Sequence, residues 1–350
     1  MIVHKSPVNE PENVDRIIGI PCRLIVPYAV PALIKHLDFF NKFNELGPSS
    51  AEKIASSFGF NPRVLDAVLC YLCKEGLLNR VEGDVDTFEL STLAKGFLLK
   101  SSEYDLTKFA LIMDGAVMGR LDEAIAQTIK TGEPANWNEE VGNWEEGMRS
   151  GLIAKTFSEG MMSRGKYLQS GMVVVLKDVL SDKKKLLDLG GSLGDYSGKL
   201  SEALPDLACT VYELPNVVSN TEKNIAEKNY VRVDTLAGDM FKDDLPNNYD
   251  VHFYSNVIHD WNNSQVKVLF EKSFNSLPSG GSIVIHDLHL DDGKKSPDIA
   301  VDHSLYLSII TSGRCYSYKE IGDMLEGVGF KDTAAYQTVG GYSVIVGHKS

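Results

Sequence analysis

The second half of the chain alternates short, β-rich runs with longer segments of helical pattern. From about residue 183 the β-rich runs are KKLLDLG, ACTVYEL, VRVDTLAGD, YDVHFYSNV and GSIVIHDL. Helical stretches of about ten to fifteen residues separate most of them. This alternation predicts a parallel, doubly wound α/β sheet of the Rossmann-like type. The last run, YSVIVGH, is predicted to form a strand at an edge of that sheet.

The first hundred residues have the pattern of short helices followed by a β-hairpin. Ser49 and Glu52 have the spacing of a capping box, with Ser49 as the N-cap. Asn61 and Pro62 start the next helix, which ends at Gly76. The run LLNRVEGDVDTFEL then predicts two short strands around a turn. Together these elements predict a winged-helix domain that is mainly α-helical.

The length of the chain, 350 residues, favours more than one folding unit. We expect a winged-helix-like dimerisation domain over residues 1–100, a helical connector over 101–180 and the α/β domain over 181–350. Aromatic and methionine side chains at helical spacing are usually core residues. Alternatively, some of them line an apolar substrate pocket between the domains. The residues predicted for this pocket are Trp144, Met161, Met162 and Cys315.

The charge of the chain bears on its partners. The formal net charge is −13, whereas nucleic-acid binding relies on a basic surface that neutralises phosphates. The second helix of the winged-helix pattern offers only Arg63 and Lys74 as basic side chains. We therefore expect this domain to serve packing or dimerisation, and we expect no nucleic-acid partner.

The location of the protein is predicted from three further observations. No apolar run is long enough to cross a bilayer, so no membrane partner is expected. The N-terminus lacks the apolar stretch of a signal peptide. Cys70 and Cys73 lie in an apolar helical segment and are interpreted as buried free thiols, not as half of a zinc site. These features predict a cytoplasmic protein in a reducing compartment.

The first of the strands runs into a glycine-bearing turn that can approach a ligand closely. It contains Asp188, Gly190 and Gly191 and continues to Gly194. A dinucleotide fingerprint would need a glycine at position 192, where Ser192 stands, so NAD and FAD are disfavoured. The spacing of small residues fits a methyl-donor loop better.

The next two strands end in groups suited to a nucleoside. Glu213 ends the second strand, where a carboxylate can accept hydrogen bonds from both ribose hydroxyls. Asp239 ends the third strand and can accept from an adenine amino group, while Met240 and Phe241 can cover the ring with apolar surface. Three successive strand ends with the appropriate groups are more specific than any one of them.

Two later strand ends carry candidate catalytic groups. His259 follows the fourth strand in the motif HDW, and Asp287 ends the fifth strand. Ligands of open α/β sheets bind at such carboxyl ends. A histidine that merely caps a loop is the structural alternative for His259.

The order of glycine loop, ELP, GDMF, HDW and a late acidic strand end resembles the plant and bacterial small-molecule O-methyltransferases. Caffeic acid, hydroxyindole and phenazine O-methyltransferases belong to this group, which also carries an N-terminal winged-helix-like dimerisation domain. The resemblance implies S-adenosyl-L-methionine as cofactor, a homodimer, His259 as general base and Asp287 as the residue that orients it. The residues predicted to bind the cofactor are Asp188, Gly190, Gly191, Glu213, Leu214, Asp239, Met240, Phe241 and Ser255.

The sequence departs from the family pattern at three positions. Ser192 replaces the middle glycine of the loop, and Ser255 replaces a lysine that often precedes the histidine by four residues. Cys315 stands where the plant enzymes have a second acidic residue beside the histidine. The last change concerns the strength of the base more than cofactor binding.

The expected function is methylation of a phenol or enol hydroxyl of a small molecule, typical of secondary metabolism. One alternative is C-methylation of an enolisable keto acid, and another is a catalyst of the same fold that retains bound donor without methylating. A bound metal would favour C-methylation, and the candidate ligands are His259, Asp287, His289 and His303. No metal is predicted. A winged-helix regulatory protein is disfavoured by the lack of a basic recognition helix.

Overall fold

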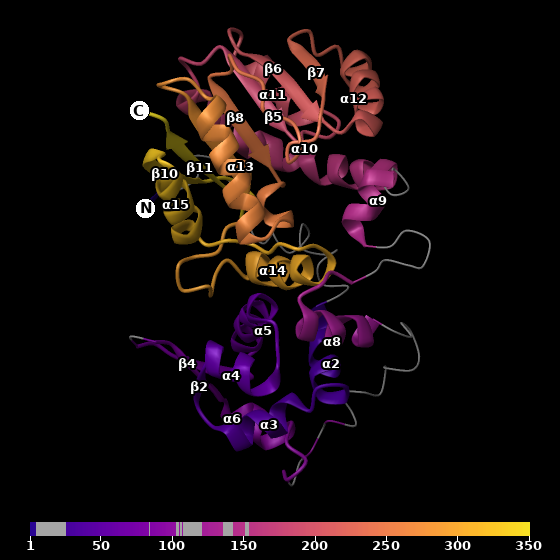
Figure 1. Cartoon of the computed structure of the whole chain (residues 1–350), viewed down its shortest axis with the longest axis vertical. Helices are drawn as coiled ribbons and strands as arrows, with labels where there is room; N and C mark the ends of the chain where they lie inside the picture. The colour runs from indigo at the N-terminus through magenta and orange to yellow at the C-terminus, as the bar shows by residue number, and fades with distance from the viewer. Residues whose placement is uncertain are drawn as a thin grey trace. The chain divides into compact units, whose positions relative to one another are not determined.

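The computed structural model describes residues 1–4, 26–83, 85–102, 105, 107, 121–135, 143–150 and 154–350. The chain divides into two compact units (Figure 1). Unit 1 comprises Met1–Ile18, Glu145–Asp292 and Tyr316–Ser350, and unit 2 comprises Gly19–Trp144 and Gly293–Cys315. Residues 293–315 thus belong with the N-terminal helices, although their position in the sequence lies within the predicted α/β domain.

Unit 1 is built on a sheet to which eight strands of the described residues contribute, in the order β1-β10-β11-β9-β8-β5-β6-β7. The five strands from β9 to β7 are mutually parallel, as the alternating pattern predicts. The strands are β1 (Ile2–His4), β5 (Lys185–Leu189), β6 (Ala208–Glu213), β7 (Val233–Ala237), β8 (Val251–Ser255), β9 (Ser282–Asp287), β10 (Lys331–Gln337) and β11 (Ser343–His348). The predicted doubly wound α/β fold is confirmed.

Helices cover both faces of this sheet. The helices α13 and α15 pack against each other, and α10 packs against α11 (Figure 1). The helices of unit 1 are α9 (Trp144–Ser150, with Trp144 assigned to unit 2), α10 (Ala154–Val179), α11 (Asp195–Ala203), α12 (Pro215–Lys228), α13 (Asn263–Ser276) and α15 (Tyr318–Val328), with the 3-10 turn η3 (Ile258–Asp260). β8 and β9 are buried along their whole length, as expected for central strands of a parallel sheet that is covered on both faces.

The last strand is not at an edge, so that part of the prediction is wrong. β11 lies between β9 and β10 and runs antiparallel to both. β10 has the sequence KDTAAYQ, in which polar and small residues give little β-strand signal. It forms a hairpin with β11, and β1 pairs with its other side and becomes the edge strand.

Unit 2 contains the predicted winged-helix pattern. Its small sheet has the order β2-β4-β3, and β3 and β4 form the expected hairpin. The N-cap of α4 is Ser50 and not Ser49, because Ser50 Oγ accepts the amide of Lys53 while Ser49 pairs with β4. The elements are η2 (Val26–Tyr28), α2 (Ala29–Lys35), α3 (Phe39–Leu46), β2 (Ser49–Ser50), α4 (Ala51–Phe58), α5 (Pro62–Lys74), β3 (Leu78–Val81), β4 (Thr87–Leu90), α6 (Thr92–Phe97), α8 (Leu121–Thr131) and α14 (Asp298–Ile310).

The helix α14 joins unit 2 through its apolar residues. Leu305 and Ile309 are part of the same buried cluster as Leu65 and Leu69 of α5. An ion pair between Lys74 and Asp302, with Nζ and Oδ1 2.6 Å apart, adds a polar contact between the two helices. A helix far along the chain therefore completes the core of the N-terminal unit.

The two basic residues of α5 are engaged inside unit 2. Lys74 pairs with Asp302, and the Arg63 guanidinium donates to the carbonyl oxygens of Gly132 and Ser308, at 3.1 and 3.5 Å. A recognition helix needs such side chains directed at base edges. These contacts support a packing role for α5.

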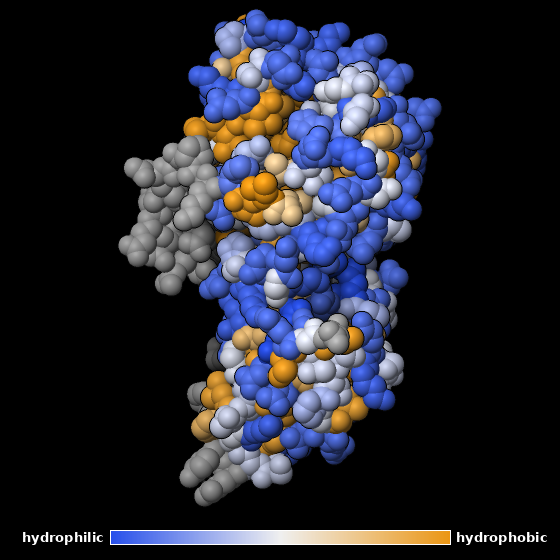
Figure 2. All heavy atoms as spheres, turned by 90° about the vertical axis from the view of Figure 1, so that its left-hand side faces the viewer, coloured by the Kyte–Doolittle hydropathy of each residue, from blue (hydrophilic) through white to orange (hydrophobic). Residues whose placement is uncertain are grey.

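The described helices and the surface can be compared with the expectation that the protein has no membrane partner. None of the helices in the described part of the chain combines the length and apolarity of a membrane span. Figure 2 shows a largely hydrophilic face on which apolar residues form separate patches. Exposed apolar side chains include those of the edge strand β1, Ile2 and Val3.

Candidate functional site

The turn after β5 brings backbone close to a buried carboxyl group. Gly190 has φ +74°, and a Cβ atom there would lie 2.9 Å from a methyl group of Val257. A Cβ atom on Gly191 would lie 2.5 Å from the carboxyl carbon of Asp188. Both positions therefore require glycine. Ser192 adopts a left-handed conformation, with φ 51°.

Asp188 lies in β5, just before this turn, and is fully buried. Ser197 Oγ donates to its Oδ2 at 2.7 Å, and Oδ1 has no hydrogen-bond partner. Burial raises the pKa of Asp188 to about 7, and the bond from Ser197 offsets only part of that effect. A buried acceptor without a partner is costly, and ligand binding beside it is one way to reduce that cost.

Glu213 ends β6, as the strand pattern predicts. Its Oε2 accepts the amide of Leu214 at 2.6 Å. Burial raises the pKa of Glu213 to about 7, against the lowering effect of the Leu214 amide, and the nearby Asp188 carboxyl adds to the increase. The carboxyl group of Asp188 therefore acts electrostatically on that of Glu213.

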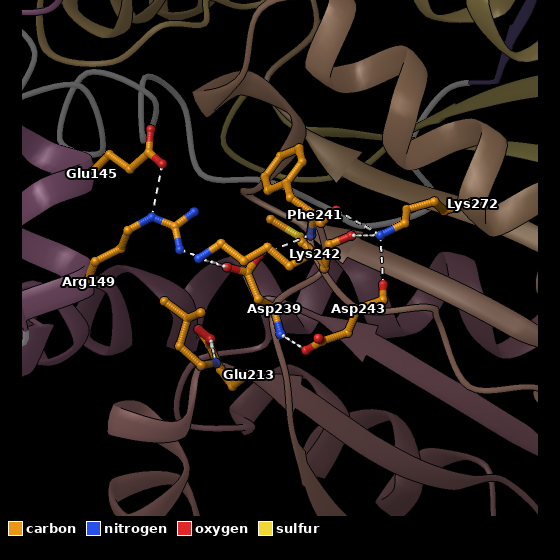
Figure 3. A network of polar contacts seen from close by, with 10 residues as sticks. Glu145, Arg149, Glu213, Asp239, Phe241, Lys242, Asp243 and Lys272 are labelled. Carbon is orange, nitrogen blue, oxygen red and sulfur yellow. Dashed lines mark hydrogen bonds and ion pairs between the residues drawn. The ribbon is translucent and has the colours of Figure 1, made fainter.

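Asp239 follows β7 and is held by two cations (Figure 3). Arg149 of α9 approaches Oδ2 to 2.8 Å, and Lys242 approaches it to 3.3 Å, while Phe241 N donates to Oδ1. Burial alone would raise the pKa of Asp239, but the bond from Arg149 and the Phe241 amide bring it down to about 2. Glu145 in turn accepts from Arg149 Nε at 3.0 Å, so Arg149 is oriented from both sides.

The loop after Asp239 carries the predicted adenine face. Phe241 contacts Trp261 of the HDW motif edge to face, with ring centroids 4.5 Å apart and planes at 69°. Lys272 of α13 donates to the carbonyl oxygens of Met240 and Phe241, both at 2.9 Å, so this loop is fixed to α13 (Figure 3).

His259 and Asp287 form a buried pair. His259 lies in η3 after β8, Asp287 ends the neighbouring strand β9, and His259 Nδ1 is hydrogen-bonded to Asp287 Oδ1. Burial alone would raise the pKa of Asp287, but the charge and hydrogen bond of His259 hold it below its ordinary value, with help from the Leu288 amide. An ionised carboxylate bound to Nδ1–H leaves Nε2 as the basic nitrogen of the ring.

The neighbouring histidines have other partners. His286 Nδ1 lies 3.0 Å from Ser255 Oγ, and His289 Nδ1 lies 2.8 Å from Ser343 Oγ. Burial lowers the pKa of His289 to about 4, so it is neutral at physiological pH. The described residues contain no group of three or more His, Cys, Asp or Glu that could hold a metal ion.

The residues predicted to line the substrate pocket take no part in the contacts described above. The side chains of Trp144, Met161 and Met162 lie outside the described residues, although their backbones belong to α9 and α10. Cys315 is fully buried, at the end of unit 2. Lining of the substrate pocket therefore stays a prediction.

Three polar residues of the site were not expected from the sequence. Ser197, Arg149 and Lys272 lie on helices that pack beside the strand ends. Each has a side chain common on helix surfaces, so its contact depends on tertiary packing. Ser197 and Arg149 contact the predicted carboxylates of Asp188 and Asp239, whereas Lys272 contacts backbone carbonyl groups.

A doubly wound sheet with a glycine turn, acidic strand ends and a buried His–Asp pair defines the class of protein. It is an α/β protein with the fold of the class I methyltransferases. The chain belongs to the family of the O-methyltransferase domain, whose family model matches residues 120–331.

Individual relatives are similar to parts of the chain. A 3-hydroxy-5-methyl-1-naphthoate 3-O-methyltransferase of Streptomyces sahachiroi is 33% identical over 49% of this chain and 50% of its own length. An L-tyrosine C(3)-methyltransferase of Streptomyces lavendulae is 30% identical over 51% of this chain and 49% of its own. The chain thus aligns with about half the length of these two relatives.

A solved structure is similar over the whole chain. It is an O-methyltransferase family 2 protein from Planctomyces limnophilus, in complex with apigenin. The TM-score is 0.83 at 22% identity, with 100% of both chains covered. At this identity the likeness supports the fold.

Proposed function

We propose that the protein is an S-adenosyl-L-methionine-dependent O-methyltransferase that acts on a phenol or enol hydroxyl of a small molecule, in secondary metabolism. The observation that carries the proposal is the His259–Asp287 pair, which lies at the same end of the parallel strands as the glycine turn and Glu213. A general base next to a nucleoside site is what methyl transfer to a hydroxyl requires.

The donor-site residues fit the proposed cofactor by their chemistry. Asp188 and Glu213 supply carboxyl oxygens for hydroxyl groups, and Asp188 Oδ1 has no hydrogen-bond partner within the protein. Only glycine fits at positions 190 and 191, because a Cβ atom there would collide with Val257 or Asp188. When bound, the cofactor supplies an electrophilic methyl group on a sulfonium.

His259 is proposed to accept the proton of the acceptor hydroxyl at Nε2. A phenol has a pKa of about 10 and free histidine about 6.5, so this transfer is uphill by about 5 kcal/mol in water. Asp287 lowers the free-energy cost of this proton transfer because its carboxylate stabilises the imidazolium. Aliphatic alcohols are much weaker acids, so phenols and enols are the preferred substrates.

The test is transfer of isotopically labelled methyl from the cofactor to a panel of phenols, enols and keto acids, read by mass spectrometry. We expect label on oxygen for the wild type and a loss of about 10²–10⁴ in rate for His259→Ala. Binding of S-adenosylhomocysteine should be unchanged in that variant. Transfer that proceeds equally fast without His259 would reject this residue as the base.

A second candidate is methylation at carbon, because one relative is an L-tyrosine C(3)-methyltransferase at 30% identity. A phenolate or enolate shares its negative charge between oxygen and a carbon atom, so the same base can serve both reactions. The position of the label in the product separates them. Loss of carbon labelling on chelation would add a metal to the mechanism.

We further propose a cytoplasmic homodimer whose N-terminal winged-helix-like domain, residues 1–100, provides the dimer contact. The proposal is supported by the apolar helices of that segment and by the resemblance of the whole chain to enzymes that carry an N-terminal winged-helix-like dimerisation domain. Light scattering on the full chain, compared with a variant that has charged residues on exposed apolar positions such as Leu93 and Phe97, tests it. A monomeric wild type would reject the dimer.

A further inference from the structure

A short loop carries the proposed adenine-binding residues and forms a single turn. The amide of Asp239 donates to Asp243 Oδ2 at 2.7 Å, and the amide of Asp243 donates back to the Asp239 carbonyl at 2.8 Å. A turn of this kind ends in carbonyl groups that no following helix satisfies. These groups need donors from elsewhere in the protein.

Lys272 supplies those donors from α13. Its Nζ donates to the carbonyl oxygens of Met240 and Phe241, both at 2.9 Å, and of Asp243, at 2.6 Å (Figure 3). An ammonium group has three N–H donors, so these bonds use all of them. Hydrogen bonds from a charged donor are stronger than neutral ones. One side chain thereby fixes most of the loop.

The same helix is also tied to the catalytic motif. α13 starts at Asn263, two residues after Trp261 of the HDW motif, and Asn262 and Gln265 form a complete capping box there. Phe241 packs against Trp261 in the same region. Lys272 therefore connects the loop to the helix that begins beside the proposed base.

We propose that Lys272 is a positioning residue for the methyl donor: its ammonium group sets the conformation of the loop 239–243 and so fixes the surface that receives adenine. The inference rests on the proposed function, because it assigns this loop to the donor. Lys272 is proposed to act through Met240 and Phe241, without taking part in proton transfer.

The test compares three variants in the full chain. Lys272→Met keeps the length of the side chain but removes its donors, and Lys272→Arg keeps charge and donors. Lys267→Met is the matched control, since Lys267 lies on the same helix and its Nζ is 3.7 Å from Glu271 in an exposed pair. Titration calorimetry with S-adenosylhomocysteine measures binding, and hydrogen exchange without ligand measures the amides of residues 239–243.

We expect Lys272→Met to weaken S-adenosylhomocysteine binding by about tenfold, with faster exchange confined to the loop. At saturating donor, kcat and the KM for acceptor should change by less than about twofold. Lys272→Arg should recover part of the affinity, and Lys267→Met should bind as the wild type does. If Lys272→Met does not fold, Lys272→Gln replaces it, and the same loss of S-adenosylhomocysteine affinity is expected.

Two results would overturn the inference. One is wild-type affinity in Lys272→Met, and the other is loss of affinity together with faster exchange throughout unit 1, which indicates general destabilisation. Glu213→Ala separates this failure from failure of the proposed function. If Glu213→Ala retains full binding, the donor site itself is wrong; if it loses binding while Lys272→Met does not, only the role of Lys272 is wrong.

Discussion

The guanidinium of Arg149 lies 2.8 Å from the carboxylate of Asp239, and this pair joins α9 to the loop after β7. Asp239 is only 13% exposed and accepts from Lys242 as well. The carboxylate expected to face adenine is therefore kept ionised by groups of the protein itself.

The first prediction concerns this pair. In Arg149→Gln the pKa of Asp239 should rise from about 2 towards its ordinary value, because the strongest hydrogen bond that lowers it is lost. NMR titration of the Asp239 carboxyl carbon measures the change. The lowered pKa of Asp239 stabilises the folded state at pH values above the pKa in the unfolded chain, about 3.9. This contribution to the free energy of unfolding is lost as the pH falls from about 4 to 2. Glu145→Gln, which leaves the Arg149–Asp239 bond in place, is the control, and an equal shift there would contradict the assignment.

The second prediction concerns the His–Asp pair. Asp287→Asn should lower kcat by about 10²–10⁴, because the amide neither stabilises the imidazolium nor fixes the same tautomer. Steady-state kinetics at saturating donor measures this. Binding of S-adenosylhomocysteine by the same variant is the internal control, and weaker binding in proportion to the lost rate would point to a structural effect.

The third prediction concerns the buried carboxyl group of Asp188. Its pKa of about 7 lies above the unfolded value, about 3.9, so the folded state holds an extra proton between these limits. Stability should fall as pH rises from about 4 to about 7, by up to ~4 kcal/mol in total. Urea unfolding at several pH values measures this slope. Asp188→Asn should make the slope shallower, and a slope unchanged in that variant would assign it to other groups such as Glu213.

The fourth prediction concerns Ser192. Its φ of 51° places a side chain in the left-handed region, at a cost of about 1 kcal/mol relative to glycine. Ser192→Gly should therefore leave stability unchanged or raise it by up to ~1 kcal/mol, since the greater freedom of glycine in the unfolded chain offsets part of the gain. Donor affinity should not fall. Thermal unfolding and calorimetry check both, and clear destabilisation would mean that the Ser192 side chain contributes a contact.

The sequence alone predicted the elements whose signal is local. The strands β5, β6, β7, β8 and β9 follow from apolar runs separated by helical segments, and Glu213, Asp239 and Asp287 are predicted because each lies at or just beyond the end of such a run. The sequence alone also predicts the glycine turn, and the structure gives the reason for the glycines, because Val257 and Asp188 leave no room for a side chain at positions 190 and 191.

Other features were decided only by the tertiary structure. β10 carries too little apolar pattern to be recognised in the sequence, so the predicted edge position of β11 is wrong. The N-cap of α4 is Ser50 and not the predicted Ser49. Arg149 and Lys272 are ordinary helix-surface residues in the sequence. They become part of the site because folding places α9 beside the Asp239 carboxylate and α13 beside carbonyl groups of the following loop. Long-range contacts of this kind leave no periodic trace in a single sequence.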